Sequence, residues 1–308
     1  DYYNQPDFPR DATISDFLAN DSPWLVYLDV WERHISYIED DCIREKALGV
    51  ADTASRSRVV WQVKVLKLDG LLNGQVTPGQ VTPQDIRQHW SMIVEERLQN
   101  PHRGCLKACA KETAEVSTDP CVTSPESKYR GEENQLYRVE IHRGGPARNK
   151  DGSNESQVAT FKWSRDNGTV AFPIISITGN MVELEHLGRD NRLSLKKGDW
   201  VEVIDDDYTL LIQSRPSPLT EIRPLAQVDS VDTTKMSVTL RLQDGSGLFE
   251  DYPEGSLKHP LLRRWDHKKG DLTEEDEPEL AGDGALYVDE GKDEDKWLTL
   301  EDGVQICF

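Results

Sequence analysis

Between residues 135 and 242 the sequence repeats one pattern: short runs of alternating apolar and polar residues, separated by Gly, Asp, Asn and Pro. Alternation with a period of two is typical of a strand that buries one face, and breaks of this composition are typical of tight turns. Strands this short and this regularly spaced favour an antiparallel sandwich or barrel over a fold of alternating strands and helices. The runs are 135–142, 158–170, 172–177, 181–186, 200–204, 208–212, 225–231 and 237–242.

One of these runs contains the pair Asn167-Gly168. Both residue types accept the positive φ angles of a two-residue hairpin turn. We therefore expect residues 135–172 to form the central antiparallel sheet, with this pair at a hairpin tip. Further along, the string 197–203 looks like the turn and strand that open an SH3-like barrel.

Ahead of this region the sequence predicts two more strands and one helix. The strands lie at 24–31 and 59–68, which are rich in aromatic and β-branched residues. The helix lies near 83–99, because Thr82 can cap it and Pro83 suits its first position. The expected fold class is mainly β, with antiparallel β-sandwich or barrel domains, one short helix and long loops.

Four parts follow from this order of elements. They are an N-terminal arm at 1–23, a main β domain at 24–175 with its helix near 83–99, a small SH3-like or barrel domain at 176–250, and an acidic segment at 251–308 that ends in a β region. The first residue is Asp1 rather than Met, and the last residues read as the middle of a strand. We expect both ends to be cut from continuing structure.

The net charge of the 308-residue chain is −20. Binding to phosphate backbones or anionic lipid needs a basic surface, so neither nucleic acid nor an anionic membrane is an expected partner. No stretch approaches the roughly 18 uninterrupted apolar residues of a membrane helix, so membrane insertion is not expected either.

The acidic charge is concentrated near the C-terminus, where residues 271–302 hold fourteen acids and two lysines. Such a block is most often a solvated loop. The alternative is a surface site for a divalent cation such as Ca²⁺. An EF-hand does not fit, because Leu298 and Val304 occupy the positions that need Gly and Glu. No other cofactor is expected.

Three cysteines, Cys105, Cys109 and Cys121, lie near His102 and invite a zinc interpretation. The segment around the first two looks extended, and residues four apart on a strand are separated by about 13 Å. One tetrahedral ion cannot bind both, so we expect no zinc site. The odd number of cysteines, five, also argues against a disulfide framework.

No phosphate loop, dinucleotide fingerprint, nucleophile elbow or zinc-protease helix occurs in the sequence. If the chain is an enzyme, the candidate catalytic residues are Glu140, His142, Asp166 and Asp266, with His267 beside the last. Nothing in the sequence requires them to converge. An acid or histidine on an alternating strand is more often a solvated or hydrogen-bonded neighbour, so an enzyme is the less favoured interpretation.

The tryptophans offer a second interpretation, a platform for sugars, although tryptophan on a strand more often belongs to the core. The candidate platform consists of Trp24, Trp31, Trp61, Trp163 and Trp200. Charged residues also stand at the ends of several predicted strands, where they can fasten strand ends or meet in one binding site. The candidate binding residues are Trp163, Arg165, Arg264 and Trp265.

Several strings in the chain together resemble an uncharacterised bacterial family, whose members tend to be encoded in phage-tail-like contractile injection system gene clusters. The strings are LVYLDVWERH at 25–34, VWQVKVL at 60–66, ENQLYRVEIH at 133–142, ATFKWSRDNG at 159–168 and RRWD at 263–266. The acidic stretch at 271–295 and a repeated Val-Thr-Pro at 76–83 look like departures from the pattern. The resemblance implies a setting and supplies no catalytic residues.

The leading hypothesis is therefore a structural or accessory component of a contractile particle, such as a baseplate, fibre or adaptor protein. Its partners would be other particle subunits in an oligomeric assembly, and its location a particle assembled in the cytoplasm or found outside the cell. The alternative is a carbohydrate-active enzyme or a β module that binds a surface glycan. A pocket that joins the four candidate catalytic residues would favour the enzyme, and a flat or edge-exposed β surface would favour the particle.

Overall fold

A computed structural model describes most of the chain in eleven segments. They are residues 5–8, 24–48, 53–68, 81–98, 104–111, 135–148, 158–213, 222–243, 257–268, 278–290 and 296–308. Two compact units are present. Unit 1 consists of residues 1–103 and 205–220, and unit 2 consists of residues 104–204 and 221–308.

The chain is mainly β, as predicted. Among the described residues, strands account for 45% and helices for 14%, and the sheets that they form are antiparallel. Among the described helices none is long and apolar enough to cross a membrane.

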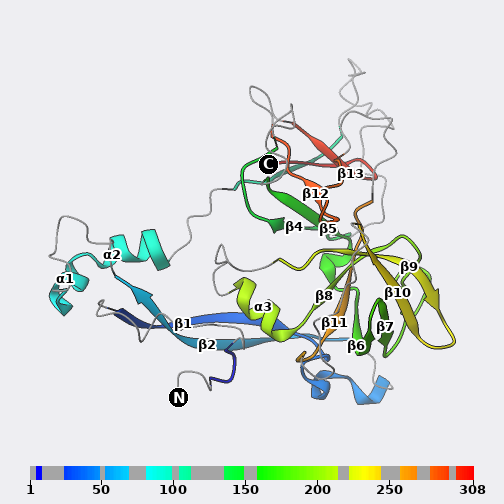
Figure 1. Ribbon diagram of the computed structural model, residues 1–308, viewed down its shortest axis with the longest axis horizontal. Coiled ribbons are helices and arrows are strands. Elements are labelled where there is room, and N and C mark those ends of the chain that lie inside the picture. The colour runs from blue at the N-terminus through cyan, green and yellow to red at the C-terminus, as the bar shows by residue number, and fades with distance from the viewer. Residues whose placement is uncertain are drawn as a thin grey trace. The chain divides into compact units, whose positions relative to one another are not determined.

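Unit 1 is built around a two-stranded ribbon (Figure 1). Strand β1 (Trp24–Ile35) pairs with β2 (Arg56–Lys67) over twelve residues each, and Leu28 lies opposite Val63. Two 3₁₀ turns, Asp41–Ile43 and Lys46–Leu48, follow β1. Helix α1 (Pro83–Gln88), helix α2 (Trp90–Ile93), a π-helical turn (Val94–Leu98) and helix α3 (Asp206–Gln213) complete the described elements of this unit.

The helix predicted near 83–99 begins where expected. The side chain of Thr82 accepts from the backbone N–H of Asp85, whose carboxylate accepts from the backbone N–H of Thr82 in return, so the capping box is complete. One continuous helix does not form. His89 has φ −105° and ψ 16°, which separates α1 from α2.

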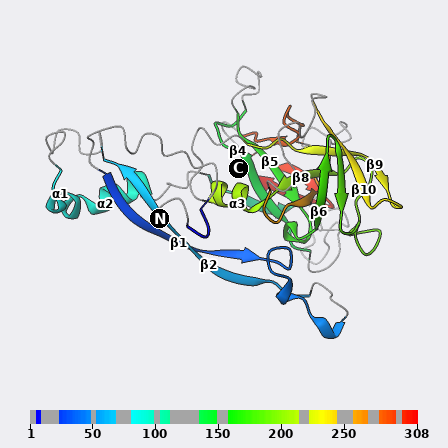
Figure 2. The ribbon, with the colours of Figure 1, turned by 60° about the horizontal axis from the view of Figure 1, so that its bottom comes forward.

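A closed six-stranded barrel forms one part of unit 2, and several of its strands can be followed in Figures 1 and 2. Its strand order is β10-β7-β6-β11-β8-β9. Apolar residues such as Val201, Val228 and Leu240 fill it. The strands are β6 (Ala171–Thr178), β7 (Met181–Leu184), β8 (Trp200–Ile204), β9 (Ala226–Asp232), β10 (Ser237–Leu242) and β11 (Leu261–Trp265). The barrel thus draws on residues on both sides of the predicted 176–250 domain.

Two three-stranded sheets make up the rest of unit 2. One has the order β12-β5-β4 and the other β13-β14-β3. They share one apolar core that includes Phe161, Leu286, Leu298 and Ile306. The strands are β3 (Lys107–Ala110), β4 (Arg138–Arg143), β5 (Thr160–Ser164), β12 (Leu286–Tyr287), β13 (Leu298–Glu301) and β14 (Val304–Cys307).

The predicted hairpin at Asn167-Gly168 is wrong. Both residues have the positive φ that the turn chemistry implies, 57° and 68°, and they lie in a 3₁₀ turn, Asp166–Gly168. The strands on either side do not pair with each other. β5 pairs with β4 and β12, while β6 pairs with β7 and β11, so the turn connects two different sheets.

The strand predicted at 208–212 is also wrong, because these residues lie in helix α3. The carboxylate of Asp205 accepts a hydrogen bond from the backbone N–H of Tyr208 at 2.9 Å, and Asp206 and Asp207 occupy the first turn. An acceptor before the helix and negative charge in its first turn stabilise the helical form over the strand that the apolar residues favour.

Candidate functional site

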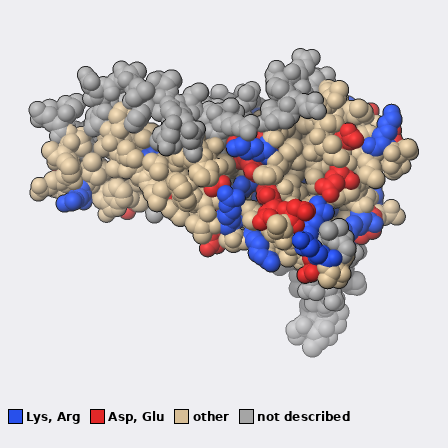
Figure 3. All heavy atoms as spheres, turned by 90° about the horizontal axis from the view of Figure 1, so that it is seen from below, with Lys and Arg blue, Asp and Glu red and all other residues tan. Residues whose placement is uncertain are grey.

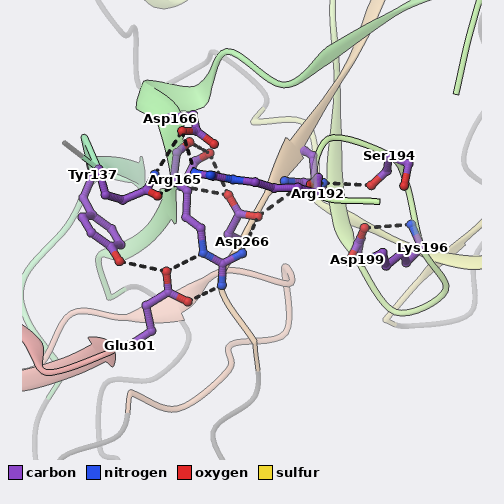
Figure 4. Close-up of polar contacts among 12 residues, drawn as sticks. Tyr137, Arg165, Asp166, Arg192, Ser194, Lys196, Asp199, Asp266 and Glu301 are labelled. Carbon is purple, nitrogen blue, oxygen red and sulfur yellow. Dashed lines mark hydrogen bonds and ion pairs between the residues drawn. The ribbon is translucent and has the colours of Figure 1, made fainter. Parts of the chain in front are cut away.

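The charged strand-end residues of unit 2 meet in one ion network, which Figure 4 shows. Arg165, which follows β5, lies between the carboxylates of Glu301 and Asp266. Its Nε lies 2.5 Å from Oε1 of Glu301, a second nitrogen bonds the other oxygen of Glu301, and Nη1 lies 3.3 Å from Oδ1 of Asp266. Tyr137 donates to Glu301 at 3.0 Å. The hydrogen bonds to Glu301 raise the pKa of Arg165, so the guanidinium stays charged.

The same network continues through Asp266, which follows β11. Its Oδ2 accepts the backbone N–H of Arg165 at 2.8 Å and the hydroxyl of Ser164 at 3.0 Å. Nε of Arg264 lies 3.2 Å from its other oxygen, and Arg264 also donates to two backbone carbonyls, at 2.7 and 2.8 Å. Each oxygen of Asp266 therefore has a partner within the protein. This arrangement fastens strand ends to one another.

A second cluster lies around Lys162 on β5 and Glu202 on β8, whose side chains are only 3% and 1% exposed. Their charged atoms are 2.6 Å apart. The indole N–H of Trp265 donates to the same Glu202 oxygen at 2.9 Å, and the lysine nitrogen lies 4.5 Å from the Trp265 ring centroid. Glu140 lies at 3.5 Å on the other side of the lysine. The short distance between the charges and the hydrogen bond from Trp265 stabilise this buried pair.

Two buried histidines belong to the same region. Burial, with the positive charge of Lys162, lowers the pKa of His142 to about 3. Burial likewise lowers the pKa of His267 to about 4. His267 donates through Nε2 to the carbonyl of Gly284 at 2.8 Å and stacks on Trp200, whereas neither ring nitrogen of His142 has a hydrogen-bond partner among the residues that the structure describes. Both rings are neutral at neutral pH.

The four candidate catalytic residues therefore divide between the two clusters. Glu140 and His142, both on β4, lie in the region of Lys162, while Asp166 and Asp266 belong to the arginine network. The carboxylate of Asp166 accepts hydrogen bonds from Arg192 at 3.2 Å and from the side-chain amide of Gln135 at 3.1 Å. A general base works best when its pKa lies near the working pH, and burial moves His142 far from that value.

The candidate binding residues are held by the protein itself. Trp163 and Trp265 are 3% and 1% exposed, and Arg165 and Arg264 already bind carboxylates. The five tryptophans of the expected sugar platform do not share a surface. Trp163 and Trp200 lie in two different core clusters of unit 2, and the other three belong to unit 1, where Trp31 and Trp61 point to opposite faces of the ribbon.

Cys105 and Cys109 are exposed, and Cys109 lies within strand β3 as expected. Cys121 and His102 fall outside the described residues, as does much of the acidic stretch. Across the segments that the structure describes, no group of three or more Cys, His, Asp or Glu side chains could hold a metal ion. On the face seen in Figure 3, acidic and basic side chains intermix in the right-hand half and do not separate by sign.

One surface was missed by reasoning from the sequence. The predicted strands at 24–31 and 59–68 form the β1–β2 ribbon, and among the described residues one face of this ribbon is open. Its exposed residues are Val26 at 59%, Leu28 at 59%, Val30 at 54%, Val59 at 61% and Trp61 at 43%. The signal was present, because apolar residues at every second position in both strands predict a single apolar face.

Comparison with known proteins places the chain in one family. A model for a family of unknown function, DUF6519, matches residues 2–73 and 99–308. The chain belongs to this family. Helices α1 and α2 lie between the two matched ranges, whereas the ribbon, the barrel and both charged clusters lie within them. No curated protein and no solved structure matches the chain.

Proposed function

We propose that this chain is a structural or accessory component of a larger protein assembly and that it acts through protein–protein contacts. The setting we propose is the phage-tail-like contractile particle that the sequence resemblance implies. The observation that supports this function is the open apolar face of the β1–β2 ribbon. Isolated two-stranded ribbons are marginally stable in water, and contiguous exposed apolar patches mark interaction surfaces.

Cross-strand pairs build this face from apolar residues on both strands. Val26 lies opposite Val65, Leu28 opposite Val63, and Val30 opposite Trp61. Full burial of one such side chain contributes about 1.5–3 kcal/mol, so covering the exposed halves of five of them is worth roughly 5 kcal/mol per chain. That gain favours a state in which another protein covers the face.

The chain covers the opposite face of the ribbon with its own residues. Val60 and Gln62 on that face are 0% and 1% exposed. The Gln62 amide donates to the backbone carbonyl of Asp7, and the Asp7 carboxylate binds Arg58 at 2.8 Å. Only one face of the ribbon therefore lacks a cover within the described residues of unit 1.

The two edges of the ribbon also differ. The Gln5 amide binds both backbone groups of Val63, accepting from its N–H at 2.6 Å and donating to its carbonyl at 3.1 Å. Those groups therefore point away from β1. In an antiparallel pair the opposite residue, Leu28, must then direct its own N–H and C=O away from β2. Val26, Leu28 and Val30 have no described partner for these outward groups.

The occupant that we propose for this edge is β1 of a second copy. The sequence Val26-Tyr27-Leu28-Asp29-Val30 is symmetric in its apolar positions about Leu28. Antiparallel pairing about a two-fold axis would place Leu28 opposite Leu28 of the second copy and Val26 opposite Val30, which extends the apolar face over four strands. Asp29 is the only charged residue in this string, and Lys64 pairs with it at 2.5 Å. The contact is thus locally neutral, although the chain carries −20.

Sedimentation analysis of the full chain tests this function. Pairing at the β1 edge leaves the apolar face open, so the dimer gains backbone hydrogen bonds and cross-strand side-chain pairs of roughly 1 kcal/mol each; set against association costs of about 4–15 kcal/mol, this predicts weak, reversible dimers at concentrations of about 100 μM and above. Leu28→Lys should abolish them. Ile175→Lys is the matched control, because Ile175 is 61% exposed on the barrel strand β6.

A second variant separates edge pairing from simple hydrophobicity. Leu28→Pro keeps an apolar side chain at this position, and the one backbone hydrogen-bonding group that it removes is an outward N–H, so β1–β2 pairing should persist while dimers are lost. A wild-type chain that stays monomeric at these concentrations, or dimers that survive Leu28→Lys, would contradict the proposal.

An enzyme that cleaves surface glycans remains the alternative function. Detection of glycan cleavage that vanishes in Glu140→Gln or Asp266→Asn would favour it. A surface Ca²⁺ site at 271–302 stays a prediction.

A further inference from the structure

A cavity of about 540 Å³ opens on the outer side of the unit 2 barrel. Pockets that hold small organic ligands have volumes of about 300–1,000 Å³. The lining combines an apolar wall, Trp200, Leu242 and Leu280, with the polar side chains of Gln227, Arg241, Gln243 and Lys268. This cavity contains none of the four candidate catalytic residues and belongs to neither charged cluster described above.

Three of the lining residues form a row across neighbouring strands. Trp200 on β8 lies opposite Gln227 on β9, which in turn lies opposite Arg241 on β10. Their sequence neighbours Val201, Ala226 and Leu240 point into the barrel core. Because side chains alternate along a strand, the row lies on the outer face, with adjacent side chains about 5 Å apart.

The middle residue of the row fixes the arginine. The Gln227 amide donates to the carbonyl of Gly198 at 3.0 Å, and its oxygen accepts from Nη2 of Arg241 at 2.7 Å. Both ends of the amide are thus engaged, which orients the guanidinium without neutralising it. A cation held in place before a ligand arrives loses less entropy when it binds.

No carboxylate of the described segments lies within ion-pair distance of either cation of the cavity, although the charge of Lys268 acts on Asp199 over a longer range. Arg148, Arg165 and Arg264 each bind carboxylates, but Arg241 and Lys268 form no ion pair with any described residue. Two unpaired positive charges lining one cavity indicate an anionic ligand.

We propose that this cavity binds an acidic saccharide with one carboxylate per sugar. The carboxylate would bind Arg241 and Lys268, the Gln243 amide would bind hydroxyl groups, and Leu280 with the indole edge of Trp200 would contact the C–H surface of the ring. The cavity is too large for an inorganic anion alone. The net charge of −20 repels polyanions but tolerates a short, sparsely charged ligand.

Isothermal titration with the galacturonic acid disaccharide tests the site, using the full chain. We expect a dissociation constant in the millimolar range or tighter, and at least about tenfold weaker binding of the uncharged galactose disaccharide. Arg241→Gln and Lys268→Gln should each weaken binding about tenfold or more. Lys235→Gln is the matched control, because Lys235 is exposed in the turn before β10 and does not line the cavity.

Two further measurements make the result decisive. Gln227→Leu keeps the cation but removes the bond that orients it, so it should also weaken binding, while circular dichroism reports whether the barrel remains folded. Leu28→Lys should bind the disaccharide normally, so this inference and the proposed function can fail separately. No binding at about 10 mM, equal affinity for the neutral disaccharide, or equal displacement by inorganic phosphate would overturn the proposal. A free oligosaccharide and the end of a surface polysaccharide share this chemistry, and titration with polygalacturonate distinguishes them.

Discussion

Mild acid should destabilise unit 2 through its two buried histidines. Above pH 6.5 His142 and His267 are neutral in both the folded and the unfolded chain. Below that pH the unfolded chain takes up a proton on each, whereas the folded chain does not until the pH approaches about 3 for His142 and about 4 for His267. The unfolded state then binds more protons, so the free energy of unfolding falls as the pH is lowered from 6.5.

The expected size of this effect follows from the pKa difference. A histidine that is fully protonated in the unfolded chain removes about 1.4 kcal/mol of stability per pH unit. Because protonation is only half complete at pH 6.5, each histidine removes roughly 1.6 kcal/mol between pH 6.5 and 5.0, and the pair removes roughly 3 kcal/mol. Above pH 5.0 the carboxylates contribute little to this slope, because their ordinary pKa values lie near 4. The window from pH 5.0 to 6.5 therefore isolates the histidines.

Urea unfolding, followed by tryptophan fluorescence, measures this slope. His142→Phe should remove about half of it, because the variant has one histidine fewer to protonate in the unfolded state. At pH 7 the same substitution should change stability by no more than about 1 kcal/mol, since it replaces a ring that has no hydrogen-bond partner within the described segments by an apolar ring of similar shape. If stability were equal at pH 6.5 and 5.0, or the variant kept the full slope, the argument from burial would be wrong.

Two substitutions test how unit 2 is held together. Lys162→Met leaves the 1%-exposed Glu202 carboxylate without its cation, so it should lower the free energy of unfolding in urea by about 3–5 kcal/mol. The double variant Lys162→Met/Glu202→Leu should recover most of this loss. Failure to recover it would show that the pair matters for more than charge compensation. Gly284→Ala should lower the melting temperature more than Gly179→Ala does. Both glycines have a positive φ, but only at Gly284 would the new Cβ lie 2.6 Å from the Trp200 ring. Equal melting temperatures for the two variants would refute that contact.

Local chemistry made some of the fold predictable. The capping box at Thr82 and the positive φ of Asn167 depend on neighbouring residues and formed as expected. Pairing of strands depends on the rest of the chain, which is why the same turn connects two sheets instead of closing a hairpin. The helix Asp206–Gln213 was missed for a related reason, since its apolar residues suit a strand and its acidic start decides the outcome.

The candidate sites were harder to predict because they join residues far apart in the sequence. Lys162 alternates with Phe161 and Trp163 and therefore reads as an outward-facing residue, yet it is 2% exposed because β5 is covered on both faces. The partners of Arg165 lie 101 and 136 residues away. Only the alternation in the β1–β2 ribbon was fully local, and it indicated an apolar face without indicating whether the chain covers that face itself.

Residue-resolved hydrogen exchange along β1 tests the central claim most directly. Tyr27 and Asp29 direct their amides into the β1–β2 ladder and should be protected at every protein concentration. The amides of Val26, Leu28 and Val30 point outward, and we expect them to exchange freely at low concentration and to become protected when the chain self-associates or enters its assembly. Outward amides that exchange at the same rate at every concentration, and also within the native assembly, would contradict the claim that this chain acts through the β1 edge.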